Sequence, residues 1–328
     1  MPARFSIVIP AMNRQSTLDY TIKTIQASDY DDYEVILHDG ASDPPLTGYP
    51  NVKLFRTDED NSMSSDWNTA LSKATGEYVI VFGCDDGILP HALTDIDSIL
   101  TEMNNPPLIR WRRIYYTWKD DSFFAQHSAE LQISVNGSSR MLDSKKLISA
   151  VAQHKMDYTY LPMLYTSAIR RDLLETLIER TGNVCTAISP DIYSGFALAS
   201  LVDKVPSIGK ATTINASSRW STGVNNFCIS ESDITKNFVR NNEREGLTLD
   251  ARLPSSDYYT MKGAILDSFY KACDNGLTDV GLLNTPVSNI PEFDGQVIIK
   301  RADNVFDASV IAGEMLKDVR YSLDFKEW

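Results

Sequence analysis

Short apolar strands alternate with amphipathic helical segments through the first hundred residues, and this alternation constrains the fold more than any other feature. Residues 4–10 (RFSIVIP) and 33–38 (YEVILH) are rich in apolar residues without helical spacing, as is typical of strands buried on both faces. Between them, Leu18, Ile22 and Ile25 recur at helical spacing. Repeated units of this kind form a mostly parallel sheet flanked by helices, so we predict an α/β fold with a Rossmann-like core. The same rhythm continues with strands at 52–56 and 78–82 and helices at 64–74 and 90–103.

The rest of the chain adds a strand at 108–118 and helices at 167–181 and 190–201. After about residue 230 the pattern changes to helical segments joined by polar stretches that contain proline. We therefore predict an α/β domain over residues 1–225 and a mostly helical C-terminal extension over residues 226–328. The helices of this extension are expected at 234–245, 257–275 and 304–318.

Composition and charge exclude several classes of protein. A chain of 328 residues, 43% of them hydrophobic, can bury a sizeable core. Its 31 Lys and Arg against 44 Asp and Glu give a formal charge of −13, whereas nucleic-acid binding needs clustered basic residues. No apolar run approaches the roughly 20 residues that span a bilayer, and the N-terminal run is too short for a secretion signal. We expect a cytoplasmic protein that binds no nucleic acid and has at most peripheral contact with the inner face of a membrane.

Two of the predicted strands are followed by acidic loops. Asp39 comes directly after the strand at 33–38, where its carboxylate can accept a hydrogen bond from a base or a sugar. Asp85 and Asp86 follow the strand at 78–82, and adjacent carboxylates repel unless a cation, hydrogen bonds or a shared proton relieves them. Ligands gather at the carboxyl ends of parallel strands, so these loops should converge. The alternative is structural, because Asp39 can make a local turn and the acidic pair can be a solvated turn or a helix cap.

Four stretches, in this order, resemble the family 2 glycosyltransferases of the GT-A fold. They are residues 5–14 (FSIVIPAMNR), 33–43 (YEVILHDGASD), 74–86 (ATGEYVIVFGCDD) and 89–90 (LP). The resemblance covers roughly residues 4–220 and implies an inverting enzyme. It divides the GT-A domain into a nucleotide-sugar-binding part, residues 1–105, and an acceptor and catalytic part, residues 106–225.

The resemblance also implies roles for individual residues. Asp39 is expected to bond the base, commonly uracil, and Asp85 with Asp86 to form the Asp-x-Asp type of element near the ribose and a metal. Carboxylate oxygens suit Mn²⁺ or Mg²⁺. Gly83 or Cys84 stands where many relatives carry another acid, which makes the acidic cluster shorter. The residues expected on the nucleotide-sugar side are Pro10, Ala11, Asn13, Arg14, Asp39, Asp66, Asn68 and Asp85.

Asp191 is the candidate for the base that removes the proton of the acceptor hydroxyl. Inverting members carry a carboxylate farther along the chain for this purpose, and Asp191 opens a predicted helix where relatives place an acidic pair. Pro190 replaces the first acid of that pair. The alternative is a purely structural role, since an acid near a helix start is favourable by about 0.3 to 1 kcal/mol.

One further loop and one strand carry cations beside aromatic rings. In residues 217–223 (SSRWSTG), Arg219 could offset the charge of a leaving group and Trp220 could stack on a sugar, although a plain surface loop has the same composition. In residues 110–115 (RWRRIY), Arg113 and its neighbouring arginines indicate a strand with one polar face.

We expect an enzyme that transfers a sugar from a nucleotide-sugar, UDP-linked by resemblance, to a saccharide or lipid-linked saccharide in the assembly of a surface polysaccharide or glycan. A non-catalytic nucleotide- or sugar-binding module stays open as an alternative. A sugar nucleotidyltransferase is a weaker alternative, because only Arg14 supplies positive charge after the first strand. A Rossmann dehydrogenase is disfavoured because G-x-G-x-x-G does not follow that strand. The C-terminal helices could form a homodimer, cover the acceptor site or dock a partner.

Overall fold

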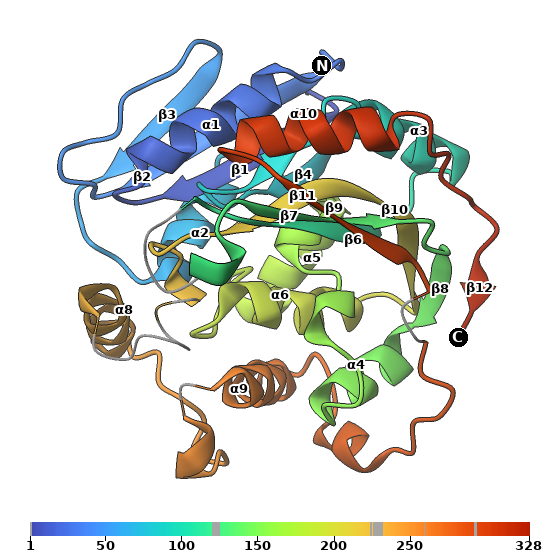
Figure 1. Ribbon diagram of the computed structural model, residues 1–328. Helices are drawn as coiled ribbons and strands as arrows, with labels where there is room; N and C mark the ends of the chain where they lie inside the picture. The colour runs from blue at the N-terminus through green and yellow to red at the C-terminus, as the bar shows by residue number, and fades with distance from the viewer. Residues whose placement is uncertain (1, 120–124, 224, 226–231, 259, 292–293) are drawn as a thin grey trace.

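The computed structural model of the chain describes all residues except 1, 120–124, 224, 226–231, 259 and 292–293. Helices cover both faces of one mixed sheet, so the described part of the molecule has three layers (Figure 1). This architecture confirms the predicted α/β fold class. The strands are β1 (Phe5–Ala11), β2 (Tyr33–Gly40), β3 (Val52–Thr57), β4 (Tyr78–Val81), β5 (Gly87–Ile88), β6 (Leu108–Thr117), β7 (Glu130–Val135), β8 (Arg140–Asp143), β9 (Ser167–Arg170), β10 (Lys204–Ser217), β11 (Gln296–Arg301) and β12 (Lys326–Glu327).

Each face of the sheet has its own set of helices and its own apolar core. The first core lies under helices α1 (Gln15–Gln26), α3 (Ala92–Glu102) and α10 (Val305–Leu316). The second lies under α2 (Met63–Leu71), α4 (Ser144–Ala152), α5 (Arg171–Thr181), α6 (Pro190–Ala199) and α9 (Met261–Asp274). Helix α8 (Asp233–Arg244) lies outside these layers, below α2 in Figure 1. Short 3₁₀ turns are present at Ala125–His127, Tyr158–Tyr160, Leu164–Thr166, Ser255–Asp257 and Val280–Asn284.

The strand order brings several carboxyl ends to one edge of the sheet. The strands run in the order β12-β8-β10-β6-β9-β4-β1-β2-β3, and β4, β1, β2 and β3 are parallel neighbours. Strand β9 is antiparallel to both β4 and β6, and β6 is parallel to β10. Strands β6 and β10 therefore run in the same direction as β1. The loops after β1, β2, β4 and β10 consequently start at the edge where open α/β sheets bind their ligands.

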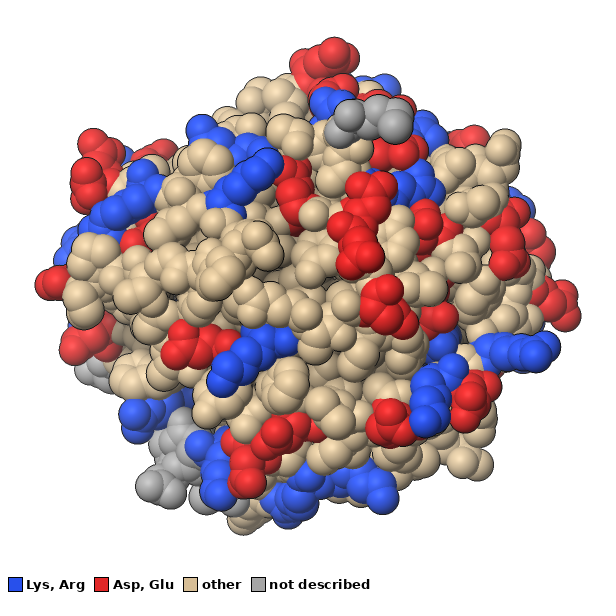
Figure 2. Space-filling model, turned by 90° about the horizontal axis from the view of Figure 1, so that it is seen from above, with Lys and Arg blue, Asp and Glu red and all other residues tan. Residues whose placement is uncertain are grey.

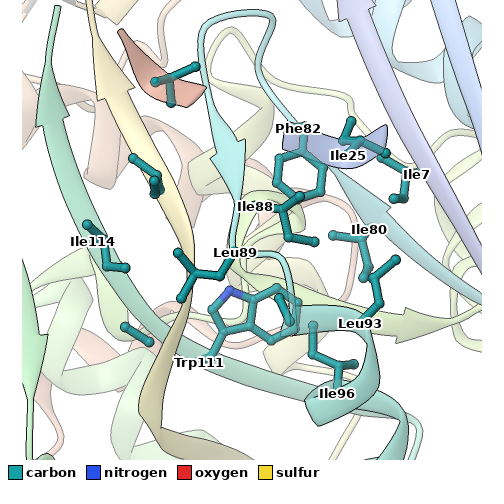
Figure 3. Close-up of a cluster of buried hydrophobic side chains, with 14 of the residues drawn as sticks. Ile7, Ile25, Ile80, Phe82, Ile88, Leu89, Leu93, Ile96, Trp111 and Ile114 are labelled. Atoms are coloured by element: carbon teal, nitrogen blue, oxygen red, sulfur yellow. The ribbon is translucent and has the colours of Figure 1, made fainter. Parts of the chain in front are cut away.

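A cluster of apolar side chains fixes the loop that follows β4 (Figure 3). Ile80 from β4 and Leu93 from α3 lie in this cluster with Trp111 from β6, and all three are essentially fully buried. The indole nitrogen of Trp111 donates a hydrogen bond to Thr213 Oγ1 at 2.9 Å, so burial leaves no orphaned polar atom there. Ile88 is buried in the same cluster directly after the acidic loop. The loop is thus held by a packed core at both of its ends.

The C-terminal region is built into this sheet and these cores. Strand β11 pairs with β7, and β12 pairs with β8. Helix α10 lies beside α1 (Figure 1), with Val305, Ala308 and Ala312 fully buried. Helix α9 packs on α6, where the rings of Phe196 and Phe269 lie 5.6 Å apart. The region was expected to be mostly helical, and the structure adds two strands to its helices. The division at residues 225 and 226 stays a prediction.

Other expectations differ from the structure in detail. The helix expected over residues 167–181 begins only at Arg171, because Ser167–Arg170 forms β9 between β4 and β6. Strands β7, β8, β10 and β11 were not predicted. Strand β7 (ELQISV) does alternate polar and apolar residues, and this signal was overlooked. Strands β8, β10 and β11 have no clear period and form by pairing with partners distant in sequence.

The molecular surface is mixed in charge. On the face covered by α1, α3 and α10, acidic and basic side chains are interspersed without a continuous basic band (Figure 2). This distribution agrees with the formal charge of −13. Within the part of the chain that the structure describes, no helix has the length and hydropathy required to cross a membrane.

Candidate active site

The acidic loop after β4 is closed by Asp86. Its Oδ1 accepts a hydrogen bond from the Ala216 amide at 2.8 Å, and its Oδ2 accepts one from the Gly83 amide at 2.9 Å. Asp86 is 5% exposed, and burial together with the charge of Asp85 raises its pKa to about 7. Oδ1 therefore ties the loop to β10, and Oδ2 closes the loop on itself. The role of Asp86 as a metal ligand stays a prediction.

Asp85 is the half-buried carboxylate of the pair. Its Oδ2 accepts hydrogen bonds from Ser218 Oγ at 3.1 Å and Ser221 Oγ at 2.7 Å. Burial raises the pKa of Asp85, while these serines and the charge of Arg14 oppose the rise. The indole nitrogen of Trp118 donates to the Asp85 carbonyl at 3.1 Å. Asp85 is thus oriented by the loop that follows β10.

Arg14 joins the loop after β1 to the same place. Its Nη2 donates a hydrogen bond to the Trp220 carbonyl. The guanidinium of Arg219 lies 4.3 Å from the centre of the Trp220 ring, and this ring is 41% exposed. Arg14 and the segment that carries Arg219 and Trp220 therefore lie together beside the loop of Asp85.

The loop after β2 reaches this group through Asn13. The Asn13 amide donates to Ser42 Oγ at 2.8 Å, and Asn13 Oδ1 accepts from the Asp43 amide at 2.8 Å. Asn13 has a φ of 55°, which brings its side chain toward the second loop. Pro10 and Ala11, also expected on the nucleotide side, end β1 in register with residues 38 and 39. The two loops form one continuous rim.

Asp39 lies inside this rim and is only 1% exposed. Its Oδ1 accepts from the Ser42 amide at 2.9 Å, while Oδ2 accepts from the Leu46 amide at 3.0 Å and from Arg56 Nη1 at 2.5 Å. These donors hold the pKa of Asp39 below its usual value in spite of burial. A base can bond this carboxylate only if one of these donors moves, and the role of Asp39 in binding a base stays a prediction.

Asp66 and Asn68, both on α2, occupy different surroundings. Asp66 is 9% exposed and lies against Gly40, and its Oδ1 has no partner among the described residues. Asn68 bonds the backbone of Cys185 with both ends of its amide, at 2.8 and 2.9 Å. Asn68 therefore holds the segment that leads to Asp191, which differs from the nucleotide contact expected for it.

Asp191 lies at the start of α6. The 3₁₀ turn Leu164–Thr166, which carries Tyr165, packs against both α6 and β4, the strand that leads into the acidic loop. Burial holds the pKa of Tyr165 well above its usual value, and the charges of Asp86, Asp191 and Asp85 add to the rise. Burial raises the pKa of Asp191, while the Ile192 amide and the charge of Arg113 oppose the rise. Ser189, and not Asp191, occupies the capping position of α6.

Several residues of this site were missed or undervalued in the sequence. Tyr165 and Asn215 gave no signal, because only the fold brings them to the acidic loop. Ser218 and Ser221 belong to a loop that the sequence singled out for its arginine and tryptophan. Arg113 was interpreted as part of a polar strand face, and its burial could not be foreseen.

Residues 6–152 match the family model described as Glycosyl transferase family 2. This part of the chain is similar in sequence to glycosyl transferase family 2. The match spans the loops after β1, β2 and β4, and Asp191 lies beyond it.

Among curated proteins, the GalNAc(5)-diNAcBac-PP-undecaprenol beta-1,3-glucosyltransferase of Campylobacter jejuni subsp. jejuni serotype O:2 is similar to this chain. The two are 29% identical over 104 residues, which cover 28% of this chain and 33% of the relative. The similarity therefore spans a third of that relative's length.

Among solved structures, S. aureus TarS 1-349 in complex with UDP-GlcNAc has a TM-score of 0.47 at 14% identity, covering 77% of each chain. The complex of TarS 1-349 with UDP has a TM-score of 0.45 at 13% identity, covering 94% of this chain and 99% of the other.

Proposed function

We propose that this protein is an inverting family 2 glycosyltransferase that moves a sugar from a nucleotide-sugar, UDP-linked by family resemblance, to an acceptor hydroxyl. The observation that carries the proposal is the convergence at one sheet edge of Asp85, Arg14 and Trp220 with Asp191. The charges of Asp85 and Asp86 on one side and of Asp191 on the other all act on Tyr165. Such an arrangement supplies a donor side and a base side to one reaction centre.

The donor side has groups suited to a departing diphosphate. Arg14 and Arg219 offer positive charge where negative charge develops, and preorganised cations of this kind stabilise such a transition state. The exposed face of Trp220 can stack on the sugar or the base. Ser218 and Ser221 keep Asp85 in place, so the binding groups need little rearrangement.

The base side consists of Asp191 at the start of α6. Single displacement with inversion needs a base on the side of the sugar opposite the leaving group. The carboxylate would accept the proton of the acceptor hydroxyl as the oxygen attacks the anomeric carbon. The raised pKa of Asp191 makes it a stronger base than an exposed aspartate once it is ionised.

The residues present fit a divalent cation in part. Asp85 is half-buried and would be the protein ligand, whereas the oxygens of Asp86 already accept two backbone hydrogen bonds. Among the described residues, no group of three or more His, Cys, Asp or Glu side chains forms a metal site. Mn²⁺ or Mg²⁺ commonly completes its shell with phosphate oxygens and water, and when bound it neutralises diphosphate charge.

The acceptor is proposed to be a saccharide, lipid-linked as the printed name of the Campylobacter relative describes for that enzyme. A lipid-linked acceptor would bring this protein to the inner face of a membrane as a peripheral component in glycan assembly. The alternative of a binding module without catalysis predicts the same ligands but no turnover.

Two assays test the proposal. Calorimetric titration with UDP, GDP, CDP and dTDP in the presence of Mn²⁺ should show preferential binding of UDP. Incubation with UDP-sugars and undecaprenyl-diphosphate-linked saccharides should then release free UDP. Binding without release from any donor and acceptor pair would support the non-catalytic module, and absence of nucleotide binding would refute the assignment altogether.

A further inference from the structure

A buried guanidinium lies beside the candidate site without an acidic partner. Arg113 on β6 is 8% exposed. Its Nη1 donates to Asn215 Oδ1 at 3.3 Å and its Nη2 contacts Met163 Sδ at 3.7 Å, both weak acceptors for a cation. Its buried Nε has no hydrogen-bond partner among the described residues, and no described carboxylate lies within ion-pair distance. Arg113 therefore forms no direct ion pair within the described part of the chain.

Other arginines in this protein form ion pairs with carboxylates. Arg4 forms ion pairs with Glu77 and Asp97 at 2.7 Å, and Arg56 pairs with Asp39. Buried charges are usually paired, because removing an ion from water without a partner costs several kcal/mol. A buried arginine without an ion pair, next to a proposed reaction centre, indicates that a ligand supplies the negative charge.

The position of Arg113 assigns it to the base side of the site. Asn215 Oδ1 accepts a hydrogen bond from Arg113. The amide nitrogen of Asn215 in turn donates to Asp86 Oδ1 at 3.4 Å. Arg113 contacts Met163, and the Met163 side chain lies against Gly195 of α6, one helical turn after Asp191. The charge of Arg113 also opposes the rise in the pKa of Asp191. Met163 belongs to the segment that carries Tyr158 and Tyr165. Arg14 and Arg219, in contrast, lie with Asp85 and Trp220 on the donor side.

The strand and the turn around Arg113 add aromatic surface to this side. Tyr115, two residues farther along β6, is 41% exposed, and Tyr158 is partly exposed. Aromatic faces pack against sugar rings, and arginine binds a carboxylate or phosphate through two parallel hydrogen bonds. A saccharide that carries an anionic group fits this combination of side chains.

We propose that Arg113 binds an anionic group, a carboxylate or a phosphate, on the sugar acceptor next to Asp191. This inference rests on the proposed function and names the class of acceptor as an anionic saccharide. The same guanidinium chemistry could serve the diphosphate of the donor or an acidic donor sugar, and the test separates these sources.

The test compares wild type with R113Q, R113K and R113M, and with R180Q as a control that removes an exposed arginine on α5. Binding of glucose 6-phosphate, glucuronate and glucose is titrated in the presence of saturating UDP and Mn²⁺. Wild type should bind both anionic sugars more tightly than glucose. R113Q should weaken the anionic sugars about tenfold or more, R113K should retain part of the preference, and R180Q should leave it unchanged.

Donor titrations complete the test. UDP affinity should change less than about twofold in R113Q. A loss of UDP affinity in R113Q would place Arg113 on the donor diphosphate and overturn the acceptor assignment. A preference for UDP-glucuronate over UDP-glucose that R113Q abolishes would overturn it as well, as would equal binding of glucose and the two anionic sugars by wild type.

The melting temperature of R113M distinguishes a ligand-binding role of Arg113 from a packing role, because the two roles predict changes of opposite sign. R113M removes a buried charge that has no direct ion pair at similar volume, so the melting temperature without ligand should rise by about 2 °C or more. A lower melting temperature would identify Arg113 as a structural residue and overturn the proposal. If wild type fails to bind any nucleotide while R113Q still abolishes glucose 6-phosphate binding, the proposed function fails and the anion site stands.

Discussion

A base for an acceptor hydroxyl must be ionised before it can accept a proton, and Asp191 lies where burial makes ionisation costly. We predict that Asp191→Asn lowers kcat for UDP release by about 10²- to 10⁴-fold, because the asparagine cannot take the proton. Wild-type kcat should rise with pH through the raised pKa of Asp191, since the carboxylate is the active form. Steady-state assays over a range of pH check both expectations.

The affinity for UDP should stay within about twofold in Asp191→Asn, because Asp191 faces the acceptor. A variant that keeps wild-type kcat would remove Asp191 from the mechanism. A variant that loses UDP affinity and kcat together would place Asp191 on the donor side.

The buried carboxyl group of Asp66 should make the stability of the protein depend on pH. Burial, with the charges of Asp60 and Glu245, raises its pKa to about 7. The folded protein then keeps a proton that the unfolded chain releases above its ordinary pKa. The stability that Asp66 contributes is therefore fully present below pH 4 and is lost as pH rises through 7.

The change in the free energy of unfolding caused by Asp66→Asn should thus be more favourable at pH 8 than at pH 4.5 by about 3 kcal/mol. Urea unfolding of the variant, of wild type and of an exposed control, Asp318→Asn, measures this difference. A pH-independent effect of Asp66→Asn would show that Asp66 is ionised in the folded protein at neutral pH.

Among the elements, α8 is attached to the start of α2 and to the residues before it by several side chains, among which Glu245 accepts the most hydrogen bonds. Glu245, directly after α8, accepts hydrogen bonds from the Ser62 amide and Ser62 Oγ at 2.6 Å and from Ser65 Oγ. Glu245→Ala should therefore loosen α8 and leave the Ser62 amide without its partner, at a cost of about 1 to 3 kcal/mol.

Hydrogen exchange measures this loosening directly. Amides of α8 should exchange faster in Glu245→Ala, whereas those of β1 and β4 should not change. Glu243→Ala, on the exposed side of α8, serves as the matched control. Equal exchange of α8 in wild type and Glu245→Ala would show that other contacts hold the helix.

The elements also show which parts of the fold the sequence could predict. Strands β1, β2 and β4 were predicted because uninterrupted apolar runs such as Ile7–Ile9 suit a doubly buried strand. Strand β9 was taken for the first turn of a helix, because four residues carry no period and its two partners are distant in sequence. The convergence of the loops followed from the parallel order of the strands. The hydrogen bonds that Asn68 and Asp86 make to Cys185 and Ala216 depend on partners 117 and 130 residues away and could not be predicted. Asp39 instead accepts from the nearby Ser42 and Leu46 amides, as the alternative of a local turn allowed.

For the whole molecule, the C-terminal region supports the acidic loop that begins near residue 83. Val305 of α10 lies against Gly87, where an added Cβ would be 2.8 Å from its side chain. Ser309 Oγ donates to the Ile88 carbonyl at 2.6 Å. Helix α10 thus packs on the residues that follow Asp85 and Asp86.

Removal of residues 303–328 should therefore expose the core under α1 and α10 and weaken the nucleotide site. Burial of Val305 and Leu316 contributes roughly 1.5 to 3 kcal/mol each, and the core residues that α10 covers add to the loss, so the total is a large part of the roughly 5 to 15 kcal/mol that stabilises a domain. We expect the shortened chain to lose its cooperative thermal transition in circular dichroism. A transition at the wild-type temperature would show that α10 is dispensable.

The central claim is that Asp85, Arg14 and Trp220 face Asp191 across one sugar-diphosphate site. A crystal structure of the protein soaked with UDP and Mn²⁺ tests it most directly. The account predicts diphosphate density between Asp85 and Arg14, the cation beside Asp85, and Asp191 on the side away from the diphosphate. Nucleotide density elsewhere on the molecule, or Asp191 turned away from the diphosphate site, would contradict it.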